Sequence, residues 1–381
     1  MKEVADSKTI INKERLIKEF CELVSVDCES FHEEAMMKVL KGKLTELGID
    51  VYEDEAGAHY GCGSGNVYGY LKGELEGAPL LFSSHMDTVS PGIGKQAVCH
   101  EDGTITSDGS TVLGSDDAAG IAAILEAVRS IREQHIPHRD LEFLFPMAEE
   151  AYVRGSSVFD YTKFKAKEAY VLDLSGAVGR ASLREPTLIS FQVKLTGRAA
   201  HAGFAPEEGI HTIAMAADAV CKIKQGRLDE RTTLNIGKIN GGTATNIVPQ
   251  EVCLEGEIRS YDHERALEVL ENVRETCDVV ASAYGGRCDV THEIHLKAYQ
   301  VEESDPVVRR FLRVCEKLGF EGGLTETFGG SDNNSFWQHG IHGIVLSCAM
   351  NQVHTTQEYT TQEELSKSAR IVAGLMTERE E

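Results

Sequence analysis

Short, nearly continuous apolar runs separated by helical patterns limit most strongly what this chain can fold into. Four such runs lie in its first half, at Val67–Leu71, Leu80–Ser83, Leu141–Phe145 and Tyr170–Leu174. Apolar residues at helical spacing mark the segments Arg15–Val24, Glu34–Leu47 and Ala118–Arg129. Strands that are apolar throughout need cover on both faces, so the sequence predicts an α/β domain whose mixed or parallel sheet is flanked by helices.

The pattern changes after Arg184. Strands with alternating apolar and polar residues are now expected at Leu188–Leu195, Glu251–Ile258 and Arg287–Leu296. Helices are expected at Ile210–Lys222 and His263–Ala283. We interpret this segment as strand–helix–strand–strand–helix–strand, which predicts a small ferredoxin-like α+β domain with a one-sided antiparallel sheet.

The first pattern returns from Asp305, with an expected helix at Pro306–Leu318 and an expected strand at Ile344–Ser347. One domain inserted into another is the simplest account of this order. We therefore expect residues 186–297 to form a domain inserted into a second one, which residues 1–185 and 298–381 form together.

Composition excludes several classes of function. The chain has 38 Lys and Arg against 61 Asp and Glu, a formal charge of −23, so it lacks the positive charge that nucleic acids or anionic membranes attract. No stretch approaches the roughly 20 apolar residues of a membrane-spanning helix, and no secretory signal is visible. The ten cysteines lie far apart without a C-x-x-C pair, which favours reduced, mostly buried thiols. We expect a cytoplasmic protein.

Residue types that bind metals follow the predicted strands of the outer domain. His85 and Asp87 come after Leu80–Ser83, and a carboxylate such as Asp87 can accept the second ring N–H of a ligating imidazole. Asp116 and Asp117 precede the apolar helix, and two adjacent carboxylates repel each other unless a cation lies nearby. A surface pair and a helix N-cap are the simpler alternatives for these two motifs.

Three further motifs follow the same pattern. Glu149 and Glu150 end a buried strand, Asp173 interrupts another, and His354 follows the last strand. A solvated loop is the alternative for the glutamates, but a buried, unpaired carboxylate at Asp173 would be costly. Considered together, two imidazoles and three carboxylates suit two zinc ions that share one carboxylate. The set is His85, Asp116, Glu150, Asp173 and His354, and Glu149 is left over as a general base.

These motifs resemble those of a known family. Nine segments occur in the order found in the co-catalytic dizinc peptidases related to aminoacylase and glutamate carboxypeptidase, and they are most similar to the tripeptide aminopeptidases of that family. They are HMDTVSPG (85–92), TVLGSDDAAG (111–120), MAEE (147–150), VLDLSG (171–176), GRAAHAG (197–203), GGTATNIVP (241–249), GEIRSYD (256–262), FGGSDNN (328–334) and VHTTQE (353–358). The resemblance spans nearly the whole chain.

The resemblance implies an exopeptidase with two Zn²⁺ ions per subunit. It implies that His85 and Asp173 bind one zinc, that Glu150 and His354 bind the other, and that Asp116 bridges them.

The resemblance also gives roles to the neighbours of these ligands. Asp87 would orient His85, and Glu149 would be the general base for attack by a zinc-bound hydroxide. The family usually has a lysine two residues after the bridging aspartate, where this chain has Ala118. This departure removes no ligand.

In the family, the inserted domain contributes substrate contacts, often across a dimer. His201 is therefore the candidate oxyanion donor, and Asn246 and Arg259 are candidates to hold the substrate, Arg259 by pairing with a peptide carboxylate. Gly330 and Ser331 would line the same pocket. The resemblance thus implies a homodimer formed through the inserted domain.

Each of these residues also has a purely structural alternative. His201 could belong to a turn of small residues, and Asn246 could form an Asx-turn. Arg259 could form a surface salt bridge with Glu255 or Glu257 on the same strand.

The expected reaction is release of the N-terminal residue from a short peptide, most specifically a tripeptide. A carboxypeptidase or an aminoacylase with the same metal site is the alternative within this class. A binding protein without catalytic activity is disfavoured, because Glu149 and all five ligand types are present.

Overall fold

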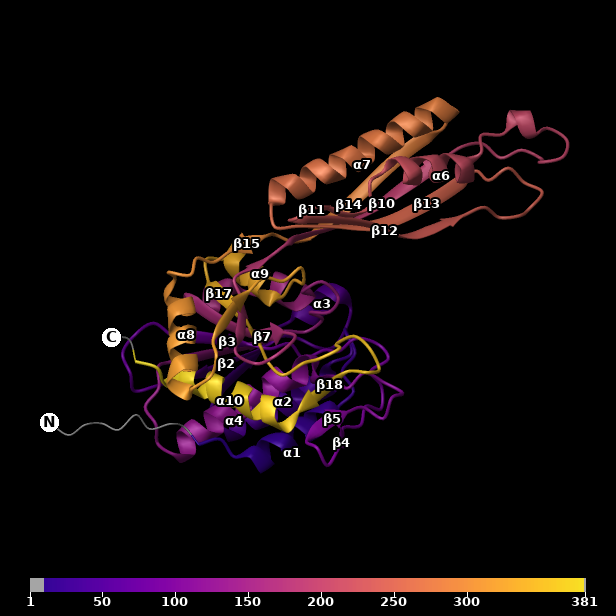
Figure 1. Cartoon of the computed structure of the whole chain (residues 1–381). Helices are drawn as coiled ribbons and strands as arrows, with labels where there is room; N and C mark the ends of the chain where they lie inside the picture. Colours follow the sequence, from indigo (N-terminus) through magenta and orange to yellow (C-terminus); the bar gives the residue numbers. More distant parts are fainter. Residues whose placement is uncertain (1–9, 380–381) are drawn as a thin grey trace. The chain divides into compact units, whose positions relative to one another are not determined.

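The computed structural model describes residues 10–379, which form two compact units (Figure 1). The first unit contains the described residues up to Leu183, Gln300–Glu326 and the chain from Ser331 onward. The second, here called the inserted unit, contains Arg184–Tyr299 and the short segment Thr327–Gly330. The sequence pattern gave no indication that this short segment belongs with the insertion.

An eight-stranded mixed sheet forms the centre of the first unit, as predicted. In spatial order its strands are β1 (Asp50–Glu53), β2 (Val67–Leu71), β6 (Leu141–Phe145), β3 (Leu80–Ser83), β7 (Glu168–Leu174), β17 (His342–Ser347), β8 (Arg180–Ser182) and β16 (Gly323–Thr325). Strands β6, β3, β7 and β17 run parallel to one another. Their carboxyl ends therefore lie at one edge of the sheet, where sites of open α/β folds form.

Helices cover both faces of this sheet. The helices of this unit are α1 (Lys13–Val24), α2 (Glu34–Glu46), α3 (Ala56–Tyr60), α4 (Ser115–Glu133), α5 (Arg154–Ser157), α8 (Pro306–Leu318), α9 (Asp332–Gln338) and α10 (Gln362–Thr377), with a 3₁₀ turn at Tyr161–Lys163. Leu81 of β3 packs in a cluster with Phe336 of α9. Its neighbour Phe82 points to the opposite face and contacts the ring of Tyr170, whose hydroxyl donates to the carbonyl of Val307 in α8. This two-sided burial explains the continuous apolar runs.

A small three-stranded sheet is formed by segments that lie near the predicted metal ligands in the sequence. It consists of β4 (Val98–Cys99), β5 (Thr104–Thr106) and β18 (Tyr359–Thr361), with β5 in the middle. Strand β18 begins immediately after Glu358, so this sheet joins the segment before α4 to the segment after β17.

The inserted unit is an antiparallel sheet with two helices on one face (Figure 1). Its spatial order is β11 (Gly226–Asp229), β12 (Thr232–Gly241), β13 (Glu251–Ser260), β10 (Thr187–Thr196) and β14 (Arg287–Leu296), and its helices are α6 (Thr212–Lys222) and α7 (His263–Tyr284). Alternate residues of β10, such as Phe191 and Val193, pack with Met215 of α6 and Val273 of α7. The one-sided α+β architecture is as predicted, with the short β11 as an additional strand.

Short elements complete the fold. They are β9 (Arg184–Glu185) and β15 (Tyr299–Gln300), which pair, and a 3₁₀ turn at Pro206–Glu208. Among residues 10–379, no helix has both the length and the apolar character needed to cross a membrane.

The cysteines are all free thiols, but the expectation that most are buried is wrong. Only Cys28, Cys277, Cys315 and Cys348 are buried, whereas Cys99 and Cys221 are exposed and the other four are intermediate. Several of the exposed or half-buried thiols lie on edge strands or on the outer faces of helices, where apolar spacing in the sequence does not report exposure.

Candidate active site

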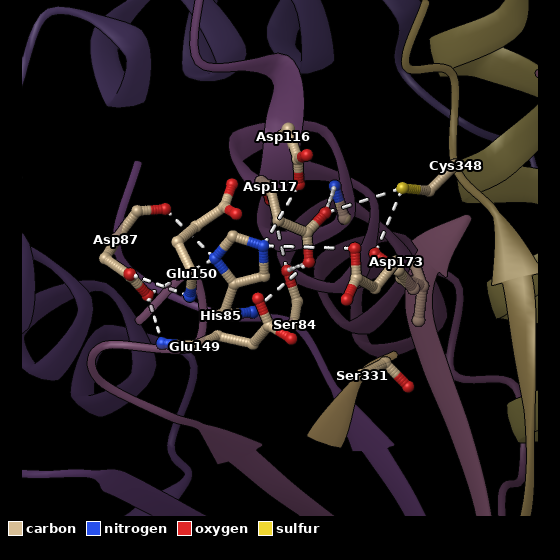
Figure 2. Close-up of polar contacts among 12 residues, drawn as sticks. Ser84, His85, Asp87, Asp116, Asp117, Glu149, Glu150, Asp173, Ser331 and Cys348 are labelled. Carbon is tan, nitrogen blue, oxygen red and sulfur yellow. Dashed lines mark hydrogen bonds and ion pairs between the residues drawn. The ribbon is translucent and has the colours of Figure 1, made fainter. Parts of the chain in front are cut away.

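Metal-ligand side chains converge beyond the carboxyl ends of the parallel strands. His85 follows β3, Glu150 follows β6, and Asp173 lies near the end of β7, while Asp116 opens α4. Ligand atoms of His85, Asp116 and Glu150 lie within 4.8 Å of one another, as do those of His85, Glu149 and Asp173. Figure 2 shows the His85 ring with these carboxyl groups around it.

The imidazole of His85 is held on both nitrogens. Its Nδ1 lies 3.0 Å from the backbone oxygen of Asp87 and 3.4 Å from the carboxylate of the same residue. Its Nε2 lies 3.0 Å from Asp116 Oδ1 and 3.9 Å from Asp173 Oδ1. The ring is only 1% exposed, so its direction is fixed by buried partners.

The carboxylate of Asp116 faces two histidines at once. Oδ1 contacts His85, and Oδ2 lies 3.3 Å from Nε2 of His354. The same nitrogen of His354 lies 2.9 Å from Glu150 Oε1. Each histidine is thus associated with a carboxylate of its own, Asp173 or Glu150, and both share Asp116.

Asp117 points elsewhere. Its Oδ2 accepts hydrogen bonds from the Ser84 hydroxyl at 2.5 Å and from the backbone N–H of His85 at 3.2 Å. Its Oδ1 accepts from the N–H of Gly120 at 3.2 Å and from the Cys348 thiol at 3.4 Å. Of the two adjacent aspartates, Asp117 therefore supports the backbone, and Asp116 is the one available to a metal.

The cluster carries an excess of buried negative charge. In the described part of the chain, the ion pairs of Asp116, Glu150 and Asp173 involve only His85 and His354. Burial, followed by the charge of Glu149, raises the pKa of Asp173 well above its usual value. Carboxylates crowded in this way with imidazoles form a donor set that suits divalent cations such as zinc.

The same surroundings shift the other groups. Burial raises the pKa of Glu149 well above that of a free glutamate and also raises that of Glu150. Hydrogen bonds to Asp116 and Glu150 raise the pKa of His354 to about 10. Burial opposes ionisation of Asp116, but hydrogen bonds from His354 and His85 hold its pKa well below the usual range.

Asp87 fixes the loop that carries the two glutamates. Its Oδ1 accepts the backbone N–H of Glu149 at 2.8 Å, and its Oδ2 accepts that of Glu150 at 3.1 Å and the Ser30 hydroxyl at 2.7 Å. The closest contact of His85 Nδ1 is the backbone oxygen of Asp87. The Asp87 side chain therefore positions the glutamates at least as much as the imidazole.

Glu358 is a supporting residue to which sequence reasoning gave no role. Completely buried, it accepts hydrogen bonds from the N–H of Gly114 at 2.8 Å, the Ser115 hydroxyl at 2.6 Å and the N–H of Asp116 at 3.0 Å. Glu358 ends the VHTTQE segment, which also contains the predicted ligand His354, and this closeness in the sequence was the signal that could have indicated its role.

Glu33 is a second supporting residue, and no sequence signal marks it. It accepts from the N–H of Ala148 at 2.9 Å, directly before Glu149, and from the Ser64 hydroxyl at 2.6 Å. It is adjacent to another glutamate, and only the fold shows that Glu33 is the buried one.

The inserted unit brings His201 and Asn246 side by side. The N–H of Ala202 donates to the Asn246 carbonyl at 2.9 Å, and His201 forms a bridge with Ile247. Nδ1 of His201 accepts hydrogen bonds from the backbone N–H groups of Gly203 and Phe204, at 3.1 and 3.2 Å. The ring proton is therefore on Nε2, which forms no hydrogen bond with any residue that the structure describes.

Arg259 forms an ion pair on its own strand, which was the structural alternative to a substrate contact. Its Nε and Nη2 donate to the two oxygens of Glu257 at 2.6 and 3.2 Å, and its Nη1 donates to the Phe328 carbonyl at 2.7 Å. Three of the five N–H groups of a guanidinium are used in this way, which leaves two for a ligand.

Gly330 and Ser331 fall on different units. Gly330 ends the segment that belongs to the inserted unit, and Ser331 begins the return to the first. The Ser331 hydroxyl accepts from the N–H of Asn333, and the Asn334 side chain accepts from the N–H of Ser331, which completes a capping box for α9. The Ser331 hydroxyl is thus engaged in helix capping.

Comparisons with known proteins agree with this arrangement. Residues 184–285 match the M20 peptidase dimerisation domain, and residues 66–209 match peptidase family M28. An uncharacterized protein of Bacillus subtilis, YqjE, is 38% identical over 369 residues, which are 97% of this chain and 99% of that protein.

Two crystal structures are similar over nearly the whole chain. A tripeptidase from Staphylococcus aureus superposes with a TM-score of 0.93 at 36% identity, covering 96% of this chain and 98% of that one. Aminopeptidase PepT from Bacillus cereus superposes with a TM-score of 0.89 at 39% identity, with the same coverage. The chain therefore belongs to the M20 peptidases, in the branch that contains this tripeptidase and PepT, and it is an enzyme that hydrolyses peptides.

Proposed function

We propose that this protein is a dizinc aminopeptidase that releases the N-terminal residue of tripeptides. The observation that carries the proposal is the carboxylate of Asp116, whose two oxygens face two different histidines. A bridging ligand between two metal ions needs this geometry. The other carboxylates, Asp173 and Glu150, are distributed one to each histidine.

In the proposed assignment, His85 and Asp173 would hold one zinc ion, His354 and Glu150 would hold the other, and Asp116 would be a ligand to both. When bound, the ions would polarise the scissile carbonyl and lower the pKa of a water molecule toward neutrality. They would also neutralise the excess buried charge of the carboxylates.

Glu149 acts as the general base in this proposal. It is buried, its pKa is raised by that burial, and its backbone is fixed by Asp87. A glutamate with a raised pKa takes a proton from water and returns it to the leaving amine more readily than an ordinary one. Because Asp87 holds the backbone of Glu149 and Glu150 together, it keeps the base and the neighbouring ligand in a fixed relation.

In this proposal the substrate contacts come from four residues of the inserted unit: His201, Asn246, Arg259 and Gly330. The Nε2–H of His201 is the donor offered to the developing oxyanion. Arg259 retains two N–H groups for the carboxylate of a short peptide, and Asn246 lies beside His201 to bind the peptide backbone. The proposed enzyme is a homodimer through the inserted unit, and its reduced thiols suit the cytoplasm.

A small substrate panel tests the proposal. It contains Ala-Ala-Ala, its N-acetylated form, a dipeptide, an N-acetyl amino acid and a folyl-glutamate analogue, each assayed with zinc and with a chelator. We expect chelator-sensitive cleavage of the free tripeptide and none of its acetylated form. Cleavage of the acylated or glutamyl compounds instead would assign the protein to the aminoacylase or carboxypeptidase type.

Light scattering after gel filtration tests the oligomeric state. We expect the mass of a dimer. A monomer that is fully active would mean that His201 acts within its own chain.

A further inference from the structure

Two cysteines lie in contact in the first unit. Cys21 is on α1 and Cys99 is on β4, 78 residues further along the chain, and their sulfur atoms are 3.9 Å apart. Cys99 is exposed, and Cys21 is partly accessible. Neither residue belongs to the proposed metal site.

We propose that Cys21 and Cys99 are a redox modification site, where a low-molecular-weight disulfide converts the thiol pair into a reversible intramolecular disulfide. At 3.9 Å the sulfur atoms already touch. A disulfide bond requires them to approach by about 2 Å more, which rotation of two cysteine side chains can supply. The pair joins separate elements, so its proximity comes from tertiary packing.

The reaction consists of two exchange steps. The thiolate of Cys99 attacks one sulfur of the small disulfide, which forms a mixed disulfide and releases one small thiolate. The thiolate of Cys21 then attacks the Cys99 sulfur, which forms the Cys21–Cys99 bond and releases the second small thiol. The protein loses two protons and two electrons, and the small disulfide takes them up and is reduced to two thiols.

The surroundings of the pair favour this order of steps. Burial, and then the neighbouring Cys99 thiol, raises the pKa of Cys21 to about 12. Cys21 is therefore a poor first nucleophile, and the exposed Cys99 is the thiol that a small disulfide reaches. Once Cys99 is in a mixed disulfide, it no longer bears the charge that opposes ionisation of Cys21.

The disulfide would link two parts of the first unit. Strand β4 pairs with β5, and β5 pairs with β18, which begins directly after Glu358. A bond from α1 to β4 would thus restrain the small sheet beside the residue that holds the backbone of Asp116.

The other thiols offer weaker candidates and a control. Cys277 and Cys288 also interact in the inserted unit, but Cys277 is fully buried. Cys221 is the other exposed cysteine, and it is a free thiol that forms no disulfide among residues 10–379. It therefore serves as a matched control for Cys99.

The test uses the full-length, zinc-loaded protein and oxidised glutathione as the probe. After the remaining thiols have been alkylated, the products are analysed by intact mass and by peptide mapping without reduction. We expect a species that has lost two hydrogens, a Cys21–Cys99 linked peptide, and recovery of the thiols with dithiothreitol. The C221S variant should give the same crosslink.

The single variants separate the two steps. In C21S the reaction should stop at Cys99, with a gain of one glutathione, because the resolving thiol is missing. In C99S no crosslink to Cys21 should form. A stable glutathione adduct on wild-type Cys99 without the linked peptide would overturn the proposal, as would a crosslink that joins Cys99 of two subunits. The peptide map of the oxidised wild-type protein distinguishes these outcomes even if a variant does not fold.

Discussion

The proposed metal cluster and the proposed substrate residues of the inserted unit are held in opposite ways. His85 and Asp87 are buried, and each has a hydrogen-bond partner in a distant segment, Asp116 for His85 and Glu149 for Asp87. His201 is exposed, and among the described residues its ring contacts only the N–H groups of Gly203 and Phe204 and the ring of Phe204. In the proposed enzyme, the buried part of the metal site, which does not include the exposed His354, would be set before substrate arrives, whereas the contacts of His201 would remain adjustable.

The largest effect is expected when the base of the buried cluster is changed and its metal ligands are kept. We expect Glu149→Gln to lower kcat by about 10²–10⁴ and to keep its zinc, because only proton transfer is removed. Steady-state kinetics and metal analysis measure the two effects. Glu363→Gln, on the exposed face of α10, is the control and should be unchanged. Near-normal turnover in Glu149→Gln would remove this residue from the mechanism.

The next test addresses the exposed region. His201→Ala should lower kcat by about 10²–10³, the usual loss when one oxyanion donor is removed, with zinc content unchanged. Phe204→Ala, which removes only the ring stacked on His201, should have a smaller effect. An increase in KM with kcat unchanged would show that His201 binds substrate without acting on the transition state.

A smaller effect is expected from the supporting residue of the buried cluster. Glu358→Ala should weaken zinc binding by about 10–100-fold, because the backbone of Asp116 loses its acceptor. Competition with a chromogenic chelator gives the affinity, and the exposed Glu363→Ala is the matched control. Unchanged affinity would mean that α4 fixes Asp116 without Glu358.

The smallest effect concerns pH and the metal-free protein. His354 has a pKa of about 10 in the folded chain against an ordinary 6.5, so its contribution to stability is complete below pH 6.5 and is lost as pH rises toward 10. Ionisation of Glu150, whose pKa burial raises, acts in the same direction. We expect the Tm of the metal-free protein to fall across this window more than that of His354→Gln. Equal slopes would contradict the assigned pairing of His354.

The sequence predicted the first unit well because its strands are buried on both faces. Apolar runs of this kind are stable when helices cover both faces of the sheet that they form. The structure has strands with the predicted bounds at residues 67–71, 80–83 and 141–145. Strand β12 was harder to locate, since TTLNIGKING contains two glycines and two asparagines and is largely exposed. Its place comes from pairing with β11 and β13, a tertiary effect that overrides weak local preference.

The candidate ligands could be named from the sequence because chemically unusual residues follow apolar strands. The supporting residue Glu33 could not, since Glu33 and its neighbour in the sequence differ only in the burial that the fold gives them. Arg259 shows a different difficulty. Glu255 and Glu257 were both possible partners, and in the structure the nearer Glu257 pairs with Arg259 while Glu255 pairs with Lys238 of β12.

The contact between Glu358 and Gly114 joins residues that are 244 positions apart. During synthesis on a ribosome, the segment with His85, Asp116 and Asp173 emerges long before His354 and Glu358. The proposed centre can therefore be completed only after the chain has been made as far as residue 358. In the proposed enzyme, a product of interrupted translation that stops before His354 would lack part of the metal site and would have no hydrolytic activity in the cell.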